Sequence, residues 1–285
     1  MTAAPRPAPQ SPHSPQSPHS PSLPPLRPPQ PLQSSRPAPA ATDLPEATVA
    51  EHLVAAMARE IEDGAVVATG VASPLAILAI AVARATHAPH LTYIACVGAL
   101  DPEVAALHPS SEDLAYLDGR SGEVTIPDLF DHARRGRIDL MFFGAAEVDA
   151  AGDTNLSGTG PLGRPAVKFP GVAGAATLRR WVARPVLVVG RQSRRNLVPA
   201  VQVASTSDRG RRTRLLTDLG VFDLGAAGAV LAARHPAASA AAIAERTGFP
   251  FESAAPLPVT PTPSRESLIA IRRIDAAGLR DRLAG

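Results

Sequence analysis

The sequence has a single cysteine, Cys96, a single lysine, Lys168, and only 4% aromatic residues. One cysteine excludes an intrachain disulfide and a cysteine-based metal cluster, and it fits the reducing cytoplasm that we expect as the location. The eight histidines contain no H-x3-H pair, so no metal site is predicted. No uncharged apolar run reaches about 18 residues, so we expect no membrane-spanning segment.

Proline is unevenly distributed, because 15 of the 31 prolines lie within residues 1–45. This segment repeats Ser-Pro and His-Ser-Pro without forming an apolar face. It is therefore predicted to be a disordered Pro/Ser-rich tail, partly in the polyproline II conformation. A passive extension, a docking segment for proline-binding domains and a targeting segment remain open as its role.

The positive charge of the chain comes from the same segment. Residues 1–42 carry three arginines and no acidic residue, whereas the whole chain has a formal net charge of +2, which leaves −1 for the rest. Nucleic-acid-binding domains have a clearly basic surface. Residues 43–285 do not, so nucleic acid is not expected as a partner.

From residue 46 the apolar pattern alternates between helix and strand. Residues 46–61 and 74–86 are predicted helices, and residues 65–69 and 90–96 are predicted buried strands. Strand, helix and strand in this order form a right-handed βαβ unit. Residues 46–285 are therefore predicted to be one α/β domain, a three-layer α/β/α fold with an open, mostly parallel sheet.

Open parallel sheets bind ligands at the carboxyl edge, where strands end. Residues 70–73 and residues 96–98 follow the first two predicted strands. The first segment lacks the G-x-G-x-x-G and G-K-[ST] patterns of phosphate-binding loops, which argues against a nucleotide site. The second segment contains the only cysteine.

Residues 140–157 are the most informative stretch. The apolar residues 140–143 are typical of a strand covered on both faces. Residues 151–153, Ala-Gly-Asp, have the composition of a hairpin turn. Asn155 and Ser157 follow two positions apart, so their side chains share one face of an extended backbone.

This stretch resembles the G-G-A-Q-x-D-x-x-G-N-x-N-x-S segment of class I CoA-transferase β subunits, of the glutaconate CoA-transferase type. Glu147 replaces the usual Gln, and Asp153 replaces the usual Asn. The matching residues are Gly144, Ala146, Asp149, Gly152, Asn155 and Ser157. The resemblance implies a CoA-transferase β-subunit-like fold and an acyl-CoA substrate, with no permanently bound cofactor.

Cys96 falls where this family has its catalytic glutamate, since residues 89–101 align without gaps to the family's P-D-x-x-I-I-V-E-S-G-x-M-D. In the transferases that glutamate attacks the thioester and carries CoA as a glutamyl thioester, which a thiol cannot form. Three interpretations of Cys96 stay open. It is a small buried residue, it marks a CoA-ester site that uses another group, or it is a nucleophilic thiolate.

Other segments resemble the β subunit of the ring-opening CoA-ester hydrolase of bacterial steroid degradation, which also departs from the catalytic glutamate. Residues 155–165 resemble its N-x-S-x-x-G-P-L-x-R-P, and residues 219–225 resemble its L-G-V-F-D-F-G. A predicted helix at residues 268–275 also has a counterpart. These likenesses imply either CoA transfer or hydrolytic ring or C–C cleavage of a CoA ester.

Residues 169–176 resemble the family's F-x-G-x-G-G-A-x loop. The resemblance implies that Gly171, Gly174 and Ala175 let backbone N–H groups approach a thioester carbonyl and stabilise its oxyanion. Ala173 replaces the middle glycine of the family pattern. A plain turn before a helix at residues 175–181 is the alternative.

Arg194 and Arg195 follow a predicted strand at residues 186–190. They match a basic step that the family carries before a strand similar to residues 201–207. Their guanidinium groups could pair with CoA phosphates. A solvated arginine patch is the alternative, because arginine supplies nearly all the positive charge of this chain.

The resemblance covers most of residues 46–285 and implies the β subunit of a CoA-thioester enzyme that acts with a separate α subunit in a hetero-oligomer. A non-catalytic scaffold or regulatory subunit that binds CoA esters is the alternative. The predicted site residues are Cys96, Asn155, Ser157, Gly171, Gly174, Ala175, Arg194 and Arg195.

Overall fold

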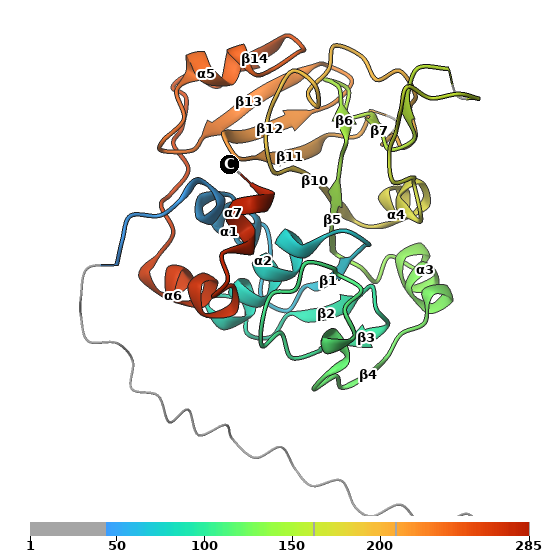
Figure 1. Cartoon of the computed structure of the whole chain (residues 1–285), viewed down its shortest axis with the longest axis vertical. Helices are drawn as coiled ribbons and strands as arrows, with labels where there is room; N and C mark the ends of the chain where they lie inside the picture. The colour runs from blue at the N-terminus through green and yellow to red at the C-terminus, as the bar shows by residue number, and fades with distance from the viewer. Residues whose placement is uncertain (1–43, 162, 209, 285) are drawn as a thin grey trace, which may run out of the picture. The chain divides into compact units, whose positions relative to one another are not determined.

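The computed structural model describes residues 44–161, 163–208 and 210–284 (Figure 1). The tail predicted for residues 1–45 lies outside the described residues, apart from its last two positions. From residue 49 onward the described part alternates between helices and strands.

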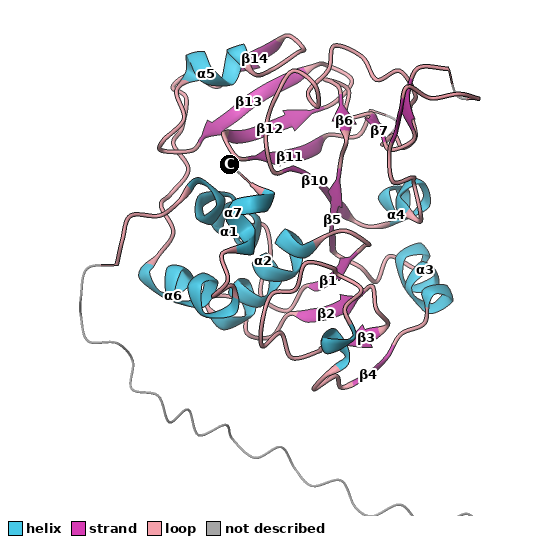
Figure 2. Cartoon of the chain, viewed as in Figure 1, coloured by secondary structure: helices cyan, strands magenta, loops and turns pink. Residues whose placement is uncertain are grey.

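The centre of the fold is a ten-stranded sheet with the order β14-β13-β12-β11-β10-β5-β1-β2-β3-β4 (Figure 2). Five of its nine neighbouring pairs are parallel, and four of these join β11, β10, β5, β1 and β2 in the middle. The predicted open, mostly parallel sheet is thereby confirmed. Its strands are β1 Val66–Thr69, β2 Thr92–Ala95, β3 Ala99–Leu100, β4 Gly122–Glu123, β5 Leu140–Gly144, β10 Arg184–Val189, β11 Thr213–Thr217, β12 Gly220–Leu224, β13 Ala229–Arg234 and β14 Phe251–Ser253.

Two small antiparallel hairpins stand outside this sheet. One joins β6 (Glu147–Val148) to β7 (Thr154–Asn155), and the other joins β8 (Gly158–Thr159) to β9 (Val167–Lys168). The first hairpin contains the turn predicted at residues 151–153. There Gly152 has φ +83°, a left-handed conformation that glycine adopts without steric cost.

Helices cover both faces of the sheet (Figures 1 and 2). One core lies between the sheet and α1, α2, α6 and α7, and the other includes side chains of α3, α4 and α5. Their bounds are α1 Val49–Arg59, α2 Pro74–Ala85, α3 Ile126–Arg134, α4 Ala175–Trp181, α5 Ala240–Glu245, α6 Arg265–Ile274 and α7 Leu279–Leu283, with a short 3-10 helix at Leu114–Leu117.

The alternation of side chains along each strand creates these two cores. In β5, Leu140 and Phe142 belong to one core, while Met141 and Phe143 belong to the other. Successive residues of a strand point to opposite faces of the sheet. An entirely apolar strand therefore requires a helical layer on each side, which confirms the three-layer α/β/α arrangement.

Local signals fix where the helices begin. At the start of α1 the Thr48 hydroxyl accepts the N–H of Glu51, and the Glu51 carboxylate accepts the N–H of Thr48. Thr125 and Asp128 form the same capping box at α3. Such reciprocal pairs satisfy two of the backbone donors that a helix leaves unpaired at its first turn.

One predicted element is wrong. Residues 201–207, which resemble a strand of the family, form a loop that touches the hairpin through a single bridge between Thr206 and Thr154. The hydroxyls of these two threonines are hydrogen-bonded to each other and to the buried Arg179. These side-chain contacts, together with backbone hydrogen bonds between Thr154 and residues 205–206, hold the segment without a regular strand ladder.

Candidate active site

A cavity of about 430 Å³ opens where β1, β2 and β5 end, and we call it the strand-end cavity. The site was predicted at this carboxyl edge of the parallel strands. Segments from six parts of the chain line it. They are residues 69–73, Cys96, three residues of α3 (Ile126, Leu129 and Phe130), residues 141–146, Leu156, and residues 170–175 with Leu178.

Cys96 lines the strand-end cavity directly after β2, and its Sγ–H group donates to the carbonyl of Ser111 at 3.3 Å. Burial raises the pKa of the Cys96 thiol, and the negative charge of Glu112 raises it further. A thiol with a raised pKa is protonated at neutral pH and is a poor nucleophile. In this chain without a partner subunit, the raised pKa of the thiol therefore argues against the thiolate interpretation of Cys96.

Two hydroxyls lie beside the thiol. The Thr69 and Tyr93 hydroxyl oxygens are 3.0 Å apart, and both residues are fully buried. Burial also raises the pKa of Tyr93, which keeps its hydroxyl neutral. This side of the site consequently holds neutral hydroxyls, while Tyr93 and the Glu112 carboxylate, which acts on the Cys96 thiol, do not line the cavity.

The turn after β1 is held by residues 111–112. The Ser73 N–H donates to the Ser111 hydroxyl at 3.1 Å, and the Ala72 N–H donates to the Glu112 carboxylate at 3.3 Å. Ala72 has φ +54°, a left-handed conformation that costs an alanine about 1 kcal/mol or more. The segment around Ser111 therefore fixes both Cys96 and the neighbouring strand end.

The loop before α4 has backbone N–H groups that meet no acceptor. The Gly171 N–H donates to the carbonyl of Leu156 at 2.8 Å, and the Ala175 N–H donates to that of Val172 at 2.9 Å. Among the described residues, the N–H groups of Ala173 and Gly174 find no hydrogen-bond acceptor. Unpaired amides beside an apolar cavity are suited to stabilise an oxyanion.

Steric limits in this loop differ from residue to residue. A Cβ at Gly174 would lie 2.7 Å from Cζ of Phe130, so α3 allows only glycine there without repacking. Gly171 has open space but φ +105°. Ala173, which replaces a family glycine, adopts φ +43° and keeps the left-handed conformation despite its Cβ. The loop thus retains the backbone path for which glycine is suited.

A buried ion pair anchors α4, which follows this loop. Arg179 is 1% exposed and pairs with the buried carboxylate of Asp208. Its guanidinium also donates to the Thr154 hydroxyl at 3.1 Å and to the Gly152 carbonyl at 3.0 Å. Through Arg179, the hairpin of residues 147–155 and the loop before α4 are held together.

Asn155 and Ser157 come together, but they do not line the strand-end cavity. The Ser157 hydroxyl lies 2.7 Å from that of Ser205, and the Asn155 amide donates to the Glu147 carboxylate at 2.8 Å. Leu156, between them, does line the cavity. Direct contact of Asn155 and Ser157 with a substrate stays a prediction.

Arg194 and Arg195 follow the carboxyl end of β10, at the same edge of the sheet as the strand-end cavity, and both are exposed. Neither guanidinium has a hydrogen-bond or ion-pair partner within the part of the chain that the structure describes. Their predicted pairing with CoA phosphates is compatible with this position and stays a prediction.

The structure therefore brings four predicted residues, Cys96, Gly171, Gly174 and Ala175, to one cavity. Sequence reasoning missed the Thr69–Tyr93 pair and the Arg179–Asp208 pair. Thr69, Tyr93 and Arg179 lie inside elements with the pattern of ordinary strands and helices, and Asp208 lies in a loop. The high arginine content also concealed that Arg179 is buried.

The strand-end cavity is lined mainly by apolar side chains. Its described lining contains no Asp, Glu, His, Lys or Arg, and its polar groups are hydroxyls, one thiol and backbone amides. In the described ranges no three His, Cys, Asp or Glu side chains group so as to hold a metal ion. No helix among the described residues is long and apolar enough to cross a membrane.

A three-layer α/β fold with an apolar cavity and free amides at the strand ends is suited to bind an acyl group and the carbonyl oxygen of its ester. The profile of one family, Coenzyme A transferase, matches residues 50–246. The chain belongs to that family, and it is a β-type subunit of a CoA-thioester enzyme.

Relatives within this fold catalyse different reactions. The chain is 69% identical to a chain in the crystal structure of the decarboxylase AibA/AibB, covering 84% of this chain and 99% of that one, with a TM-score of 0.82. It is 26% identical to the β subunit of 3-oxoadipate CoA-transferase from Pseudomonas knackmussii, over 79% of this chain and 92% of the relative. It is 31% identical to the cholesterol ring-cleaving hydrolase IpdB subunit of Rhodococcus jostii, over 54% and 66% respectively.

The solved structures of the decarboxylase name two subunits and a substituted cysteine. AibA/AibB carries the names of two subunits, and its solved structures include variants in which one cysteine is replaced by Asn, Val, Ser or Ala. Decarboxylation was not among the reactions that the sequence predicted.

Proposed function

We propose that this chain, together with a CoA-transferase-type α subunit, decarboxylates an acyl-CoA whose acyl group carries a free carboxylate. The observation that carries the proposal is the combination of 69% identity to a chain of a decarboxylase with a cavity whose described lining has no carboxylate. A cytoplasmic location, expected from the single cysteine, belongs to the same proposal.

The absent carboxylate argues against CoA exchange. Ping-pong exchange requires a side chain that takes CoA as a stable thioester and returns it. Cys96 occupies the position of the family glutamate and carries a protonated thiol instead. An acyl-CoA bound in the strand-end cavity would keep its own thioester bond.

The apolar lining favours loss of CO₂. A substrate carboxylate that enters an apolar site loses its hydration, whereas the charge of the transition state spreads toward the thioester. The C–C bond to the carboxylate breaks, CO₂ leaves, and the electron pair moves into the thioester as an enolate. A proton then adds at carbon. This route needs the carboxylate on the carbon alpha to the thioester carbonyl, or on the gamma carbon of an alpha,beta-unsaturated thioester, so that the electron pair left on carbon is conjugated with the thioester.

The loop before α4 supplies the stabilisation that this enolate needs. The N–H groups of Ala173 and Gly174 are free to donate to the developing thioester oxyanion. Preorganised amide donors lower the energy of such charge without reorganisation. Gly171 and Ala175 keep the loop in place through their hydrogen bonds to Leu156 and Val172.

The test is co-expression with the α subunit followed by incubation with glutaconyl-CoA. We expect release of one CO₂ per molecule, measured by coupled assay, and a product that remains a CoA thioester by mass spectrometry. Succinyl-CoA is the matched control and should not react, because its carboxylate is on the saturated beta carbon and loss of CO₂ would leave a carbanion that is not conjugated with the thioester. Free CoA, or CoA exchanged onto added acetate, would refute the proposal in favour of hydrolysis or transfer.

A further inference from the structure

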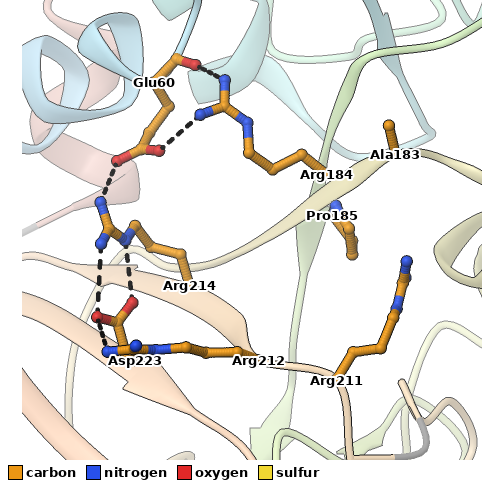
Figure 3. A pocket seen from close by; sticks show the side chains of 8 residues that line it. All are labelled: Glu60, Ala183, Arg184, Pro185, Arg211, Arg212, Arg214 and Asp223. Carbon is orange, nitrogen blue, oxygen red and sulfur yellow. Dashed lines mark hydrogen bonds and ion pairs between the residues drawn. The ribbon is translucent and has the colours of Figure 1, made fainter.

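A second cavity, of about 460 Å³, lies at the opposite edge of the sheet, and we call it the arginine cavity (Figure 3). It is formed at the first residues of β10 and β11. Both strands run parallel to β5, so their amino ends lie away from the strand-end cavity. The lining residues are Glu60, Ala183, Arg184, Pro185, Arg211, Arg212, Arg214 and Asp223.

The lining of the arginine cavity has an excess of positive charge. Four of its side chains are arginines and two are carboxylates. Asp223 accepts from Arg214 at 3.1 Å and from Arg212 at 2.9 Å. Each guanidinium has five N–H donors. Carboxylates that are already shared between arginines leave most of these donors unused.

Glu60 is shared in the same way. Its carboxylate accepts from Arg214 at 3.2 Å and lies 3.7 Å from Arg184, as Figure 3 shows. Glu60 therefore neutralises two guanidiniums only in part, although Arg184 also lies 3.8 Å from the carboxylate of Glu62, which does not line the cavity. Glu60 also fixes both of them at one side of the cavity.

Arg211 stands apart from these pairs in Figure 3. Its Nη2 donates to the backbone carbonyl of Arg179 at 2.5 Å and lies 3.8 Å from the Asp208 carboxylate, which Arg179 already engages. The Arg211 side chain is 43% exposed, and that of Arg212 is 73% exposed. Two guanidiniums with free donors therefore border the open space.

We propose that the arginine cavity binds the phosphate groups of a small molecule. The planar fork of a guanidinium matches phosphate oxygens in bidentate geometry, and the cavity volume is within the range of small-molecule sites. The phosphates belong either to the nucleotide part of a CoA ester or to a separate phosphorylated effector. The proposal does not depend on decarboxylation.

The test is calorimetric titration of inorganic pyrophosphate into the full-length chain co-purified with its α subunit, at constant ionic strength. We expect saturable binding that the double variant Arg211→Gln, Arg212→Gln weakens by about tenfold or more, because two charge-assisted contacts are lost. Arg120→Gln is the matched control, since Arg120 is an exposed arginine paired with Glu123 away from the cavity. It should bind as the wild type does.

A titration of CoA into the same proteins identifies the source of the phosphates. Weaker CoA binding by the double variant assigns the arginine cavity to the nucleotide part of CoA. Unchanged CoA binding, with pyrophosphate binding lost, assigns it to a separate effector. Absence of saturable pyrophosphate binding by the wild type, or equal binding by all three proteins, would overturn the proposal.

Discussion

At the scale of single residues, the proposed reaction gives a specific expectation for Cys96. The raised pKa of its thiol and its hydrogen bond to Ser111 describe a protonated, packed side chain. We therefore expect Cys96→Ala and Cys96→Ser to keep kcat/KM for decarboxylation within about tenfold of the wild type, since no bond to sulfur forms.

The alternative to this prediction is nucleophilic catalysis by the thiolate. A loss of about a thousandfold or more in both variants, with a covalent acyl adduct on the wild type by intact mass, would establish that alternative. Thermal unfolding of each variant separates a folding defect from a loss of chemistry.

The loop before α4 offers a second contrast between single residues. Gly174→Ala places a Cβ 2.7 Å from Phe130, and we expect it to cost about 1–3 kcal/mol of stability and to lower kcat. Ala173→Gly relieves a left-handed alanine and should leave stability unchanged or raise it by up to about 1 kcal/mol. Denaturant unfolding and steady-state kinetics measure both. Equal effects of the two changes would contradict the steric account.

At the scale of elements, the Arg179–Asp208 pair stabilises the position of α4. Removal of one partner of a buried ion pair leaves an uncompensated charge, so we expect Arg179→Met to cost about 3–5 kcal/mol in the free energy of unfolding. The double change Arg179→Met, Asp208→Leu removes both charges and should recover much of that loss. If the double variant is no more stable than Arg179→Met, the ion pair is not what holds α4.

The elements that were predicted correctly are those whose bounds are set by the apolar pattern of their own residues. Residues 175–181 form α4 at the predicted bounds, and residues 74–86 differ from α2 by one residue. The segment 201–207 has a strand-like composition, yet Thr206 is held by side chains of Thr154 and Arg179. Contacts made by residues of distant elements cannot be predicted from the sequence pattern of the segment that they stabilise.

At the scale of the whole molecule, topology accounts for one part of the candidate site, because parallel strands place the end of β2, and with it Cys96, at the carboxyl edge. The loop from Gly171 to Ala175 was predicted from the family resemblance instead. The arginine cavity at the other edge could not be predicted, because it depends on how Glu60 at the end of α1 meets β10 and β11. The family resemblance gave the class of enzyme, and it did not suggest the decarboxylation that we propose.

The packing of the whole domain also predicts its sensitivity to acid. His235 is 2% exposed, and its Nε2–H donates to the Thr217 carbonyl at 2.9 Å while Nδ1 accepts from the Thr260 hydroxyl at 2.8 Å. Burial lowers the pKa of His235 to about 4. Burial likewise lowers the pKa of His52, whose ring stacks on that of His235 at 6.3 Å.

The sign of the pH dependence follows from these shifts. Below about pH 6.5 the unfolded chain binds a proton at residue 235, whereas the folded chain binds it only near pH 4. The contribution of His235 to the free energy of unfolding is therefore fully present above pH 6.5. It falls by about 3 kcal/mol on acidification to pH 4, at 1.36 kcal/mol per pH unit. His235→Gln keeps a donor and an acceptor without titrating, so its urea midpoints should fall less over this range. His132→Gln, a half-buried histidine on α3, is the control. A wild type and a His235→Gln variant that lose stability equally would assign the acid sensitivity to other groups.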